Sequence, residues 1–288
     1  MDADQELQRA LVEIGIPPRP EILTHLDAEA RKDDPDYRQI EKLISAEVGI
    51  SAALIKTINS PLYGLRTKVS SVHQAISMLG MSTVTRVVTG MALRNIAAGA
   101  NIADVEEFLE ASAERALVTS YIAKMLGGIN SDHAFTFGLF QNCGILLLIA
   151  RRPGYKKVLE LARRTPDRIM THTEIDHLGI SHAYIGSLMA KEWGLGEAIT
   201  EAIWHHHDYD EITRKPGKEA TKNALLKETQ DLIALGLLAE RAIQYNPEFE
   251  RGADWVSGGR LALEHFGFFE DNFHNITQKV QEVLGVLH

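Results

Sequence analysis

The segment VSSVHQAISMLGMSTVTRVV (69–88) decides the fold class. Its apolar residues recur at intervals of three and four positions, which places them on one face of an α-helix. Two such stripes follow one another: Val72, Ala75, Ile76 and Leu79, then Val84, Val87, Val88 and Met91. Gly80 lies between the stripes and is a suitable helix stop, while Ser70 or Ser71 is a suitable N-cap for the first.

The same spacing continues along the chain, and the strict alternation of a β-strand is hard to find. Further apolar stripes lie within 185–189 and 276–287, and the prolines fall at expected helix edges. The sequence therefore predicts an all-α fold, with an N-terminal helical subdomain packed on a C-terminal helical bundle. A small, polar stretch divides the two, so we expect domains at 1–100 and 101–288. The second ends in a helical extension, 246–288, which packs back on the body or forms a partner interface.

The composition is that of an ordinary globular protein, with 45% hydrophobic and 24% charged residues among 288. The one cysteine, Cys143, allows no internal disulfide and lies in an apolar stretch, so we expect a buried, inert thiol. The N-terminus lacks the basic start and apolar core of a signal peptide. No uninterrupted apolar run approaches the roughly 18–20 residues that span a bilayer. We therefore expect a cytoplasmic protein without a membrane partner.

The charge balance argues against a nucleic-acid partner. The formal charge is −9, from 39 acidic and 30 basic residues, whereas non-specific nucleic-acid binding depends on Lys and Arg neutralising phosphates. A basic run at 151–164 could form a local basic patch, but such a run is typical of a solvated helix face.

Two ordered sets of motifs run through the chain. The N-terminal set is IPPRPEI (16–22), GISAALIKTINSPLYGL (49–65) and the 69–88 segment; the C-terminal set is GLFQNCGILLL (138–148), GISHAYIGSLMAKEWGL (179–195) and AIWHHHDYD (202–210). In order and spacing they resemble the HDOD family, over roughly 14–245. The resemblance implies a bacterial regulatory domain that works through protein contacts, often beside receiver or cyclic-dinucleotide-related domains. It also implies a scaffold shared with the HD-type metal-dependent phosphohydrolases.

The Asn-Ser-Pro turn of the N-terminal set has two interpretations. Asn tolerates left-handed backbone and can bond nearby backbone groups, and Pro fixes φ. Asn59, Tyr63 and Gly64 can therefore build a tight connection between helices, or they can take part in binding.

The metal site of the HD enzymes is largely replaced in this chain. Those enzymes hold metal ions with a lone His, a His-Asp pair, further histidines and a late Asp, which together activate water for attack on phosphorus. Here Gln141 and Asn142 take the place of the His-Asp pair, and neutral amides are poor transition-metal ligands. The lone His falls at or beside Arg115, whose guanidinium cannot ligate a metal, and the late Asp falls at or beside Glu240. We therefore expect no metal, no cofactor and no catalytic residue.

Three histidines occupy positions that resemble the histidine ligands of the HD enzymes. His182 matches the family's Gly-Ile-x-His motif, and His206 and His207 match its His-His pair. On a helix beginning near Glu197, His206 faces inward and His207 lies at the edge of the same face. Because no acidic partner pair accompanies them, we expect hydrogen-bonded core residues rather than metal ligands.

Gln141 and Asn142 lie in an almost wholly apolar stretch, 132–150, which predicts one buried helix. Buried amides need partners, because an unpaired polar group costs about 1–3 kcal/mol. We hypothesise that a hydrogen-bond network replaces the ion, with Arg115 supplying the positive charge and Glu240 neutralising it. The candidate residues of this vestigial site or ligand pocket are Arg115, Gln141, Asn142, His182, His206, His207 and Glu240. A polar cluster without a ligand, and an anion or nucleotide pocket centred on Arg115, remain as alternatives.

The sequence thus favours a non-catalytic signal-transduction output module with signalling proteins as partners. One alternative is a phosphohydrolase of the HD type, against which the Gln141-Asn142 pair argues. The other is a sensor that holds a small anion or a nucleotide in the old site.

Overall fold

The computed structural model describes residues 12, 14–30, 32, 35–46, 48–59, 67–96, 101–244 and 252–285. All regular secondary structure in these residues is helical, and none of them lies in a β-strand. The prediction of an all-α fold is confirmed.

The chain divides into two compact units, one of residues 18–95 and 282–288 and the other of 1–17 and 96–281. The stretch before residue 18 joins the larger unit through its backbone carbonyls. The Arg151 guanidinium donates to the carbonyl oxygens of Ile14 and Gly15, and the Trp193 indole donates to that of Pro17. The expected domains, 1–100 and 101–288, stay a prediction.

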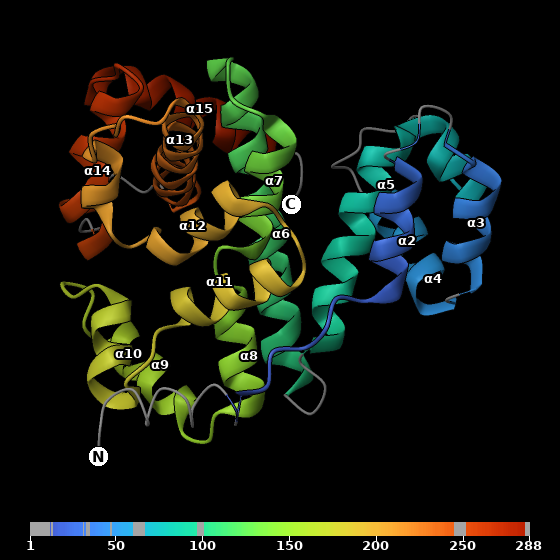
Figure 1. Cartoon of the computed structure of the whole chain (residues 1–288), viewed down its shortest axis with the longest axis horizontal. Helices are drawn as coiled ribbons and strands as arrows, with labels where there is room; N and C mark the ends of the chain where they lie inside the picture. The colour runs from blue at the N-terminus through green and yellow to red at the C-terminus, as the bar shows by residue number, and fades with distance from the viewer. Residues whose placement is uncertain are drawn as a thin grey trace. The chain divides into compact units, whose positions relative to one another are not determined.

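The smaller unit is built from amphipathic helices. They are α2 (Glu21–Ala30), α3 (Tyr37–Ala46), α4 (Val48–Ile58) and nearly all of α5 (Val72–Ile96), as Figure 1 shows. Their apolar faces form its core, which includes Leu23, Leu26, Ile40, Ile44, Leu54, Ile58, Val72, Ile76, Val84 and Val88. The Ser71 hydroxyl accepts a hydrogen bond from the Gln74 amide at the start of α5. Gly80, with φ 75° and ψ 169°, breaks the helical backbone between the two predicted stripes. Both features agree with the sequence.

The Asn59 side chain joins α4 to the segment before α5. Its amide accepts from Val69 N at 2.8 Å and donates to Val69 O at 2.7 Å and to Ile55 O at 2.9 Å. Asn59 therefore builds a connection between helices, while Tyr63 and Gly64 lie outside the described residues.

The larger unit holds the remaining elements, apart from the end of α15 from residue 282 on. They are α6 (Ile102–Leu126), α7 (Ser131–Phe140), α8 (Cys143–Arg151), α9 (Tyr155–Arg163), α10 (Met170–Leu178), α11 (His182–Glu192), α12 (Glu197–His205), the 3₁₀ helix η2 (Tyr209–Thr213), α13 (Ala220–Ile243), α14 (Ala253–His265) and α15 (Glu270–Gly285). Asn101 caps the start of α6 and Asn130 that of α7. Within this unit α13 packs against α6, α7, α12 and α14, and α11 packs against α8 and α12 (Figure 1).

The apolar stretch Ser131–Arg151 is long enough and apolar enough to cross a membrane by length and composition, contrary to our expectation. Two thirds of it, 67%, is buried inside the protein, as in the core helices of soluble proteins. A turn at Gln141 and Asn142 separates α7 from α8, so the prediction of one helix over 132–150 is wrong at this point. The turn matters because it places both amides at the junction of two core helices.

A glycine contact holds α8 against the start of α11. A Cβ added to Gly144 would lie 2.0 Å from the His182 carbonyl oxygen and 2.8 Å from Gly186 N. Only a residue without a side chain allows the two helices to approach so closely.

The C-terminal helices pack back on the body of the larger unit. The rings of Trp255 in α14 and Phe273 in α15 stack at 5.7 Å, and Gln281 donates to Ala242 O in α13 at 2.6 Å. Of the predicted apolar stripe, Ile276 and Val280 are buried, and Leu287 lies outside the described residues.

Candidate functional site

Three histidine side chains converge inside the larger unit. His182 is the first residue of α11, and His206 and His207 follow the end of α12. Their nearest ring nitrogens all lie within 4.8 Å of one another, and the Nε2 atoms of His182 and His206 are 3.3 Å apart. His182 and His206 are buried, and the side chain of His207 is 12% exposed.

Local structure explains this arrangement. The Ser181 hydroxyl caps α11 by accepting from Tyr184 N, so the helix begins at His182. The chain leaves α12 after His205, and the Nδ1 atom of His206 lies 2.7 Å from Ile203 O. The turn between α7 and α8 brings Asn142 Oδ1 to 3.1 Å from His206 Nε2.

Two carboxylates orient the histidines. Glu174 in α10 is fully buried and accepts from the Nδ1 atom and the backbone N of His182, at 2.7 and 2.9 Å, and from the Tyr155 hydroxyl at 2.5 Å. Asp254, at the start of α14, accepts from His207 Nδ1 and from the Tyr209 hydroxyl, each at 2.6 Å. Each carboxylate thus holds one imidazole by its Nδ1 side, with a tyrosine as second donor.

The electrostatics follow from these pairs. Burial disfavours the charged form of Glu174, but the charge and hydrogen bonds of His182 outweigh burial and lower the pKa of Glu174. Burial likewise opposes ionisation of His207, yet the Asp254 carboxylate raises the pKa of His207. Burial, with the charges of His207 and His182, holds the pKa of His206 well below its usual value. His206 is therefore a neutral ring beside two imidazole–carboxylate pairs.

A second polar group lies beside the histidines. Arg115 Nε in α6 is 3.5 Å from Glu240 Oε1 in α13, and Gln141 Nε2 donates to the same oxygen at 3.4 Å. Two buried atoms of this group, Arg115 Nε and Gln141 Oε1, make no hydrogen bond with any described residue. The group is thus held by an ion pair and one long hydrogen bond.

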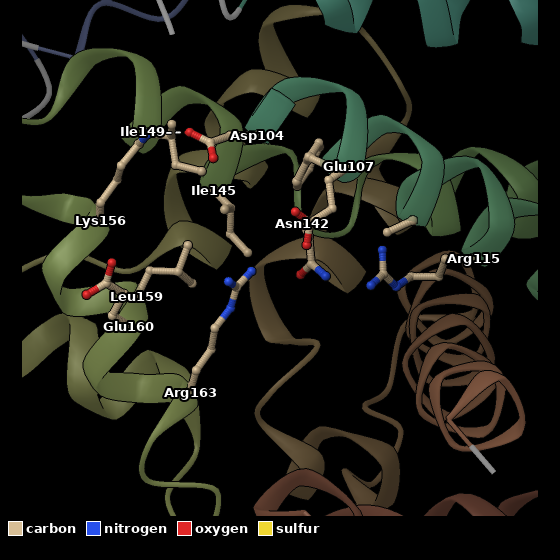
Figure 2. A pocket seen from close by; sticks show the side chains of 12 residues that line it. Asp104, Glu107, Arg115, Asn142, Ile145, Ile149, Lys156, Leu159, Glu160 and Arg163 are labelled. Carbon is tan, nitrogen blue, oxygen red and sulfur yellow. Dashed lines mark hydrogen bonds and ion pairs between the residues drawn. The ribbon is translucent and has the colours of Figure 1, made fainter. Parts of the chain in front are cut away.

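A pocket of about 250 Å³ opens where α6, α8 and α9 meet. Figure 2 shows the guanidinium groups of Arg115 and Arg163 pointing toward Asn142 from two sides. Apolar side chains line much of the rest: Phe108, Ala111, Ile145, Ile149 and Leu159. Three acidic residues, Asp104, Glu107 and Glu160, balance the three basic ones, and Lys156 pairs with Asp104. None of the three histidines lines this pocket.

A family model for the HDOD domain matches residues 16–209 of the chain. The chain belongs to the HDOD family. The match takes in the three histidines and the Gln141-Asn142 turn, and it ends before Glu240 and Asp254.

Solved structures share the fold of this HDOD chain. An HDOD domain protein of unknown function from Geobacter sulfurreducens has a TM-score of 0.69 at 19% identity, over 98% of this chain and 97% of that one. A candidate phosphohydrolase from Shewanella amazonensis SB2B has 0.66 at 21% identity, over 96% and 94%. A candidate signal transduction protein from Marinobacter aquaeolei VT8 has 0.63 at 19% identity, over 99% and 65%.

A curated relative, an uncharacterized protein of Treponema pallidum (strain Nichols), is 23% identical over 200 residues. The match covers 67% of this HDOD chain but only 38% of the relative, so the relative is much the longer protein.

The structure brings all the predicted site residues of this HDOD chain into two adjoining groups. Asn142 lies with His182, His206 and His207, and Gln141 lies with Arg115 and Glu240. His206 is buried and His207 partly exposed, as the helix face predicted. An ion pair joins Arg115 to Glu240, and hydrogen bonds join Gln141 to Glu240 and His206 to Asn142. Among the described residues, no hydrogen bond or ion pair joins the two groups.

Sequence reasoning missed the carboxylates. It expected histidines of an HDOD core without acidic partners, whereas Glu174 and Asp254 each hold one. Glu174 precedes His182 by eight residues and Asp254 follows His207 by 47, so no spacing rule connects them. Glu174 stands among polar residues in the segment MTHTEIDHL (170–178), so nothing in the sequence marked it as buried.

The residues of this HDOD chain do not fit the metal centre of the HD enzymes. Amides stand in place of its His-Asp pair, and the Arg115 guanidinium is 3.5 Å from Glu240, which would have to serve as the late carboxylate ligand. An ion at that point would face a fixed positive charge and an amide in place of two ligands. The chemistry of the donor set therefore excludes that centre.

Proposed function

We propose that this HDOD chain is a non-catalytic regulatory module, which passes a signal through contacts with other proteins in a bacterial cytoplasm. The observation that carries the proposal is the Gln141-Asn142 turn between α7 and α8. It puts two uncharged amides where the HD phosphohydrolases need an ionised, metal-bridging carboxylate to activate water.

The remaining carboxylates support the same conclusion. Glu174 and Asp254 are each bound to an imidazole and a tyrosine hydroxyl, and Glu240 faces Arg115 and Gln141. A general base must reach the proton that it removes, and these carboxylates are already engaged by fixed donors. The pocket also supports a non-catalytic role. A ligand bound in it would contact Asn142 and Arg115 but none of the three histidines.

Hydrolysis assays test the catalytic half of the proposal. The purified chain is incubated with p-nitrophenyl phosphate, bis-p-nitrophenyl phosphate and a cyclic dinucleotide, with added manganese or nickel. We expect release of product no faster than in the metal blank. Turnover that rises with protein concentration and is abolished by Asn142→Ala contradicts the proposal.

Affinity capture tests the regulatory half. The tagged chain is used as bait in its native host, and we expect a signalling protein, such as a receiver-domain protein of a response-regulator pathway, to be enriched reproducibly. A chain that captures only metabolic enzymes for phosphoesters, and no signalling protein, argues against this role.

The pocket favours a second candidate function, a sensor of a small anion or nucleotide. Arg115 and Arg163 offer charge, Asn142 offers an amide, and the apolar wall can take a base. Thermal-shift measurements with phosphate and cyclic nucleotides test it, because a ligand at 100 times its dissociation constant adds about 2.7 kcal/mol. We expect Arg163→Ala to remove any shift and Arg260→Ala, outside the pocket, to retain it. Absence of a shift with every ligand rejects the sensor.

A further inference from the structure

We infer that a surface patch where α12 ends beside α11 binds an arginine-rich segment of a partner protein. The patch consists of Tyr184, Glu201, Trp204, His205 and Asp208, which contact one another in series. None of the five belongs to the buried histidine cluster. The inference rests on the proposed function, because it names the chemistry of one protein contact that such a regulatory module would make.

The exposure of Trp204 is the first observation. Tryptophan is highly buried on average, and Trp193 and Trp255 follow this rule with 1% and 9% of their surface exposed. Trp204, near the end of α12, is 45% exposed. Packing within the chain therefore leaves much of this side chain uncovered. Tryptophan is also enriched among the residues that carry most of the binding energy in protein interfaces.

Neighbouring rings hold Trp204 in place. The His205 ring stacks on it, with centroids 4.8 Å apart and planes at 29°. The ring of Tyr184, near the start of α11, lies 5.7 Å away, and α11 and α12 pack against each other (Figure 1). Side chains that are already held in position lose less conformational entropy when a partner binds. The patch is thus preorganised for a contact.

Two carboxylates flank the stacked rings. Glu201 Oε2 lies 3.8 Å from His205 Nε2, and Asp208 Oδ2 lies 3.4 Å from His205 Nδ1. The Glu201 and Asp208 side chains are 38% and 55% exposed, and no lysine or arginine among the described residues pairs with either. The neighbouring Glu211 differs, because Arg214 Nε lies 3.1 Å from its Oε2. Two negative charges are therefore left for a cation from outside.

The combination of rings and carboxylates selects arginine. Among aromatic rings, tryptophan attracts a cation to its face most strongly. A guanidinium group can stack flat on such a face and also form paired hydrogen bonds with a carboxylate, whereas a lysine ammonium is a compact and more strongly hydrated charge. The net charge of −9 attracts a basic segment over a longer range as well.

Peptide binding to the full chain tests the inference. Fluorescence anisotropy follows a labelled hexa-arginine peptide, with EDTA present so that no divalent ion bridges the carboxylates. We expect one peptide per chain, with an affinity that falls as salt is added. A hexa-lysine peptide should bind at least about threefold more weakly, because it cannot stack in the same way. Absence of binding, or equal affinity for the two peptides, overturns the inference.

Variants locate the peptide. Trp204→Ala should weaken binding about tenfold or more, as for a residue at the centre of an interface. Glu201→Gln should weaken it about two- to fivefold, as for an exposed ion pair. Trp204→Phe keeps an aromatic face and should bind more tightly than Trp204→Ala. Circular dichroism reports the folding of each variant. An unchanged affinity in folded Trp204→Ala refutes the patch.

Glu41→Gln is the matched control for the loss of one charge. Glu41, in the smaller unit, also faces a histidine, with its Oε2 3.0 Å from His73 Nδ1. Its side chain is 37% exposed, against 38% for Glu201, and the structure shows no contact of the His73 ring with another ring of the described residues. We expect this variant to bind the peptide as the unaltered chain does. Equal losses in Glu41→Gln and Glu201→Gln would mean that net charge alone holds the peptide, and would refute the patch.

Sedimentation velocity tests a second copy of the chain as the occupant. We expect the unaltered chain and Trp204→Ala to sediment alike without peptide. A dimer that Trp204→Ala abolishes would assign the patch to a second copy and overturn the inference.

The inference and the proposed function fail separately. Peptide binding at the patch, together with capture of a signalling protein from the host, supports both. Capture of a signalling protein without peptide binding refutes the patch but not the regulatory role. Peptide binding without any captured signalling protein refutes the role but not the patch.

Discussion

At the scale of single residues, Gly144 has the least room for a side chain among the described glycines of the larger unit. The backbone of α11 lies where its side chain would be, and Gly144 follows by two residues Asn142, whose Oδ1 lies 3.1 Å from His206 Nε2. The close approach of α8 to α11 therefore depends on this one glycine.

Gly144→Ala is expected to destabilise the chain by about 1–3 kcal/mol or more, because the added carbon would meet backbone atoms that cannot move independently. Urea denaturation followed by circular dichroism measures the change. Gly217→Ala is the control, since nothing lies within 4 Å of its Cβ position, and its effect should stay within about 0.5 kcal/mol. Equal effects of the two substitutions would refute the close contact.

Asp231 makes an acid-sensitive contact outside the cluster of His182, His206 and His207. Burial opposes its ionisation, but hydrogen bonds from His265 and Lys227, at 2.7 and 2.6 Å, outweigh burial and lower its pKa. A carboxyl whose pKa is lower in the folded state adds stability above its unfolded pKa of about 3.9, and this stability is lost as the pH falls through the folded pKa.

We therefore expect Asp231→Asn to destabilise the chain more at pH 7 than at pH 3. Denaturation curves across this range measure the difference. Asp176→Asn is a control, because its pair with Arg168 is exposed and contributes little. A cost of Asp231→Asn that does not change with pH would count against the contact.

At the scale of elements, the spacing of apolar residues predicted the helices and several of their ends. It did not predict a turn that lies inside an apolar stretch. The stripes around Gly80 predicted a break that the structure contains. The break between α7 and α8 was not predicted, because Gln141 and Asn142 carry none of the glycine or proline signals of a helix end. Tertiary contacts of the two amides, invisible in the sequence, accompany that turn.

The site was predictable to a similar degree. Motif positions placed the three histidines and both amides, because those residues lie within the family's ordered segments. Glu174 and Asp254 could not be placed, since a contact between residues on different helices follows from packing and not from spacing.

The connection between α4 and α5 depends on the three hydrogen bonds of Asn59. Asn59→Ala should cost about 1–3 kcal/mol, because it leaves backbone groups of Val69 without their partner. Asn223→Ala, which removes a single bond to Gly217, should cost less than about 0.5 kcal/mol. Thermal unfolding of the two variants compares them, and a neutral Asn59→Ala would show that the connection holds without its amide.

At the scale of the whole molecule, α14 and α15 up to Gln281 are part of the larger unit and not an appendage. Trp255 is 9% exposed, stacks on Phe273 and lies under the Arg241 guanidinium. The core thus continues past the end of the family match at residue 209 to at least Val280.

Trp255→Ala should destabilise the larger unit by about 3–5 kcal/mol, as usual for a large aromatic side chain removed from a core. Trp204, which is 45% exposed, provides the matched substitution, and Trp204→Ala should cost far less. Differential scanning calorimetry of the two variants checks the contrast. Similar melting temperatures would show that α14 contributes little to the core.

The hydrogen bond between His207 and Asp254 matters for the choice of end points when such chains are shortened for experiments. A fragment that stopped at residue 209 would keep all three imidazoles and lose the carboxylate that aligns one of them. The family match is thus shorter than the stretch of chain that holds the three histidines together with their carboxylate partners. A shortened chain designed on the ends of the family match would lack Asp254. A negative result from it would say nothing about the chain that contains this carboxylate.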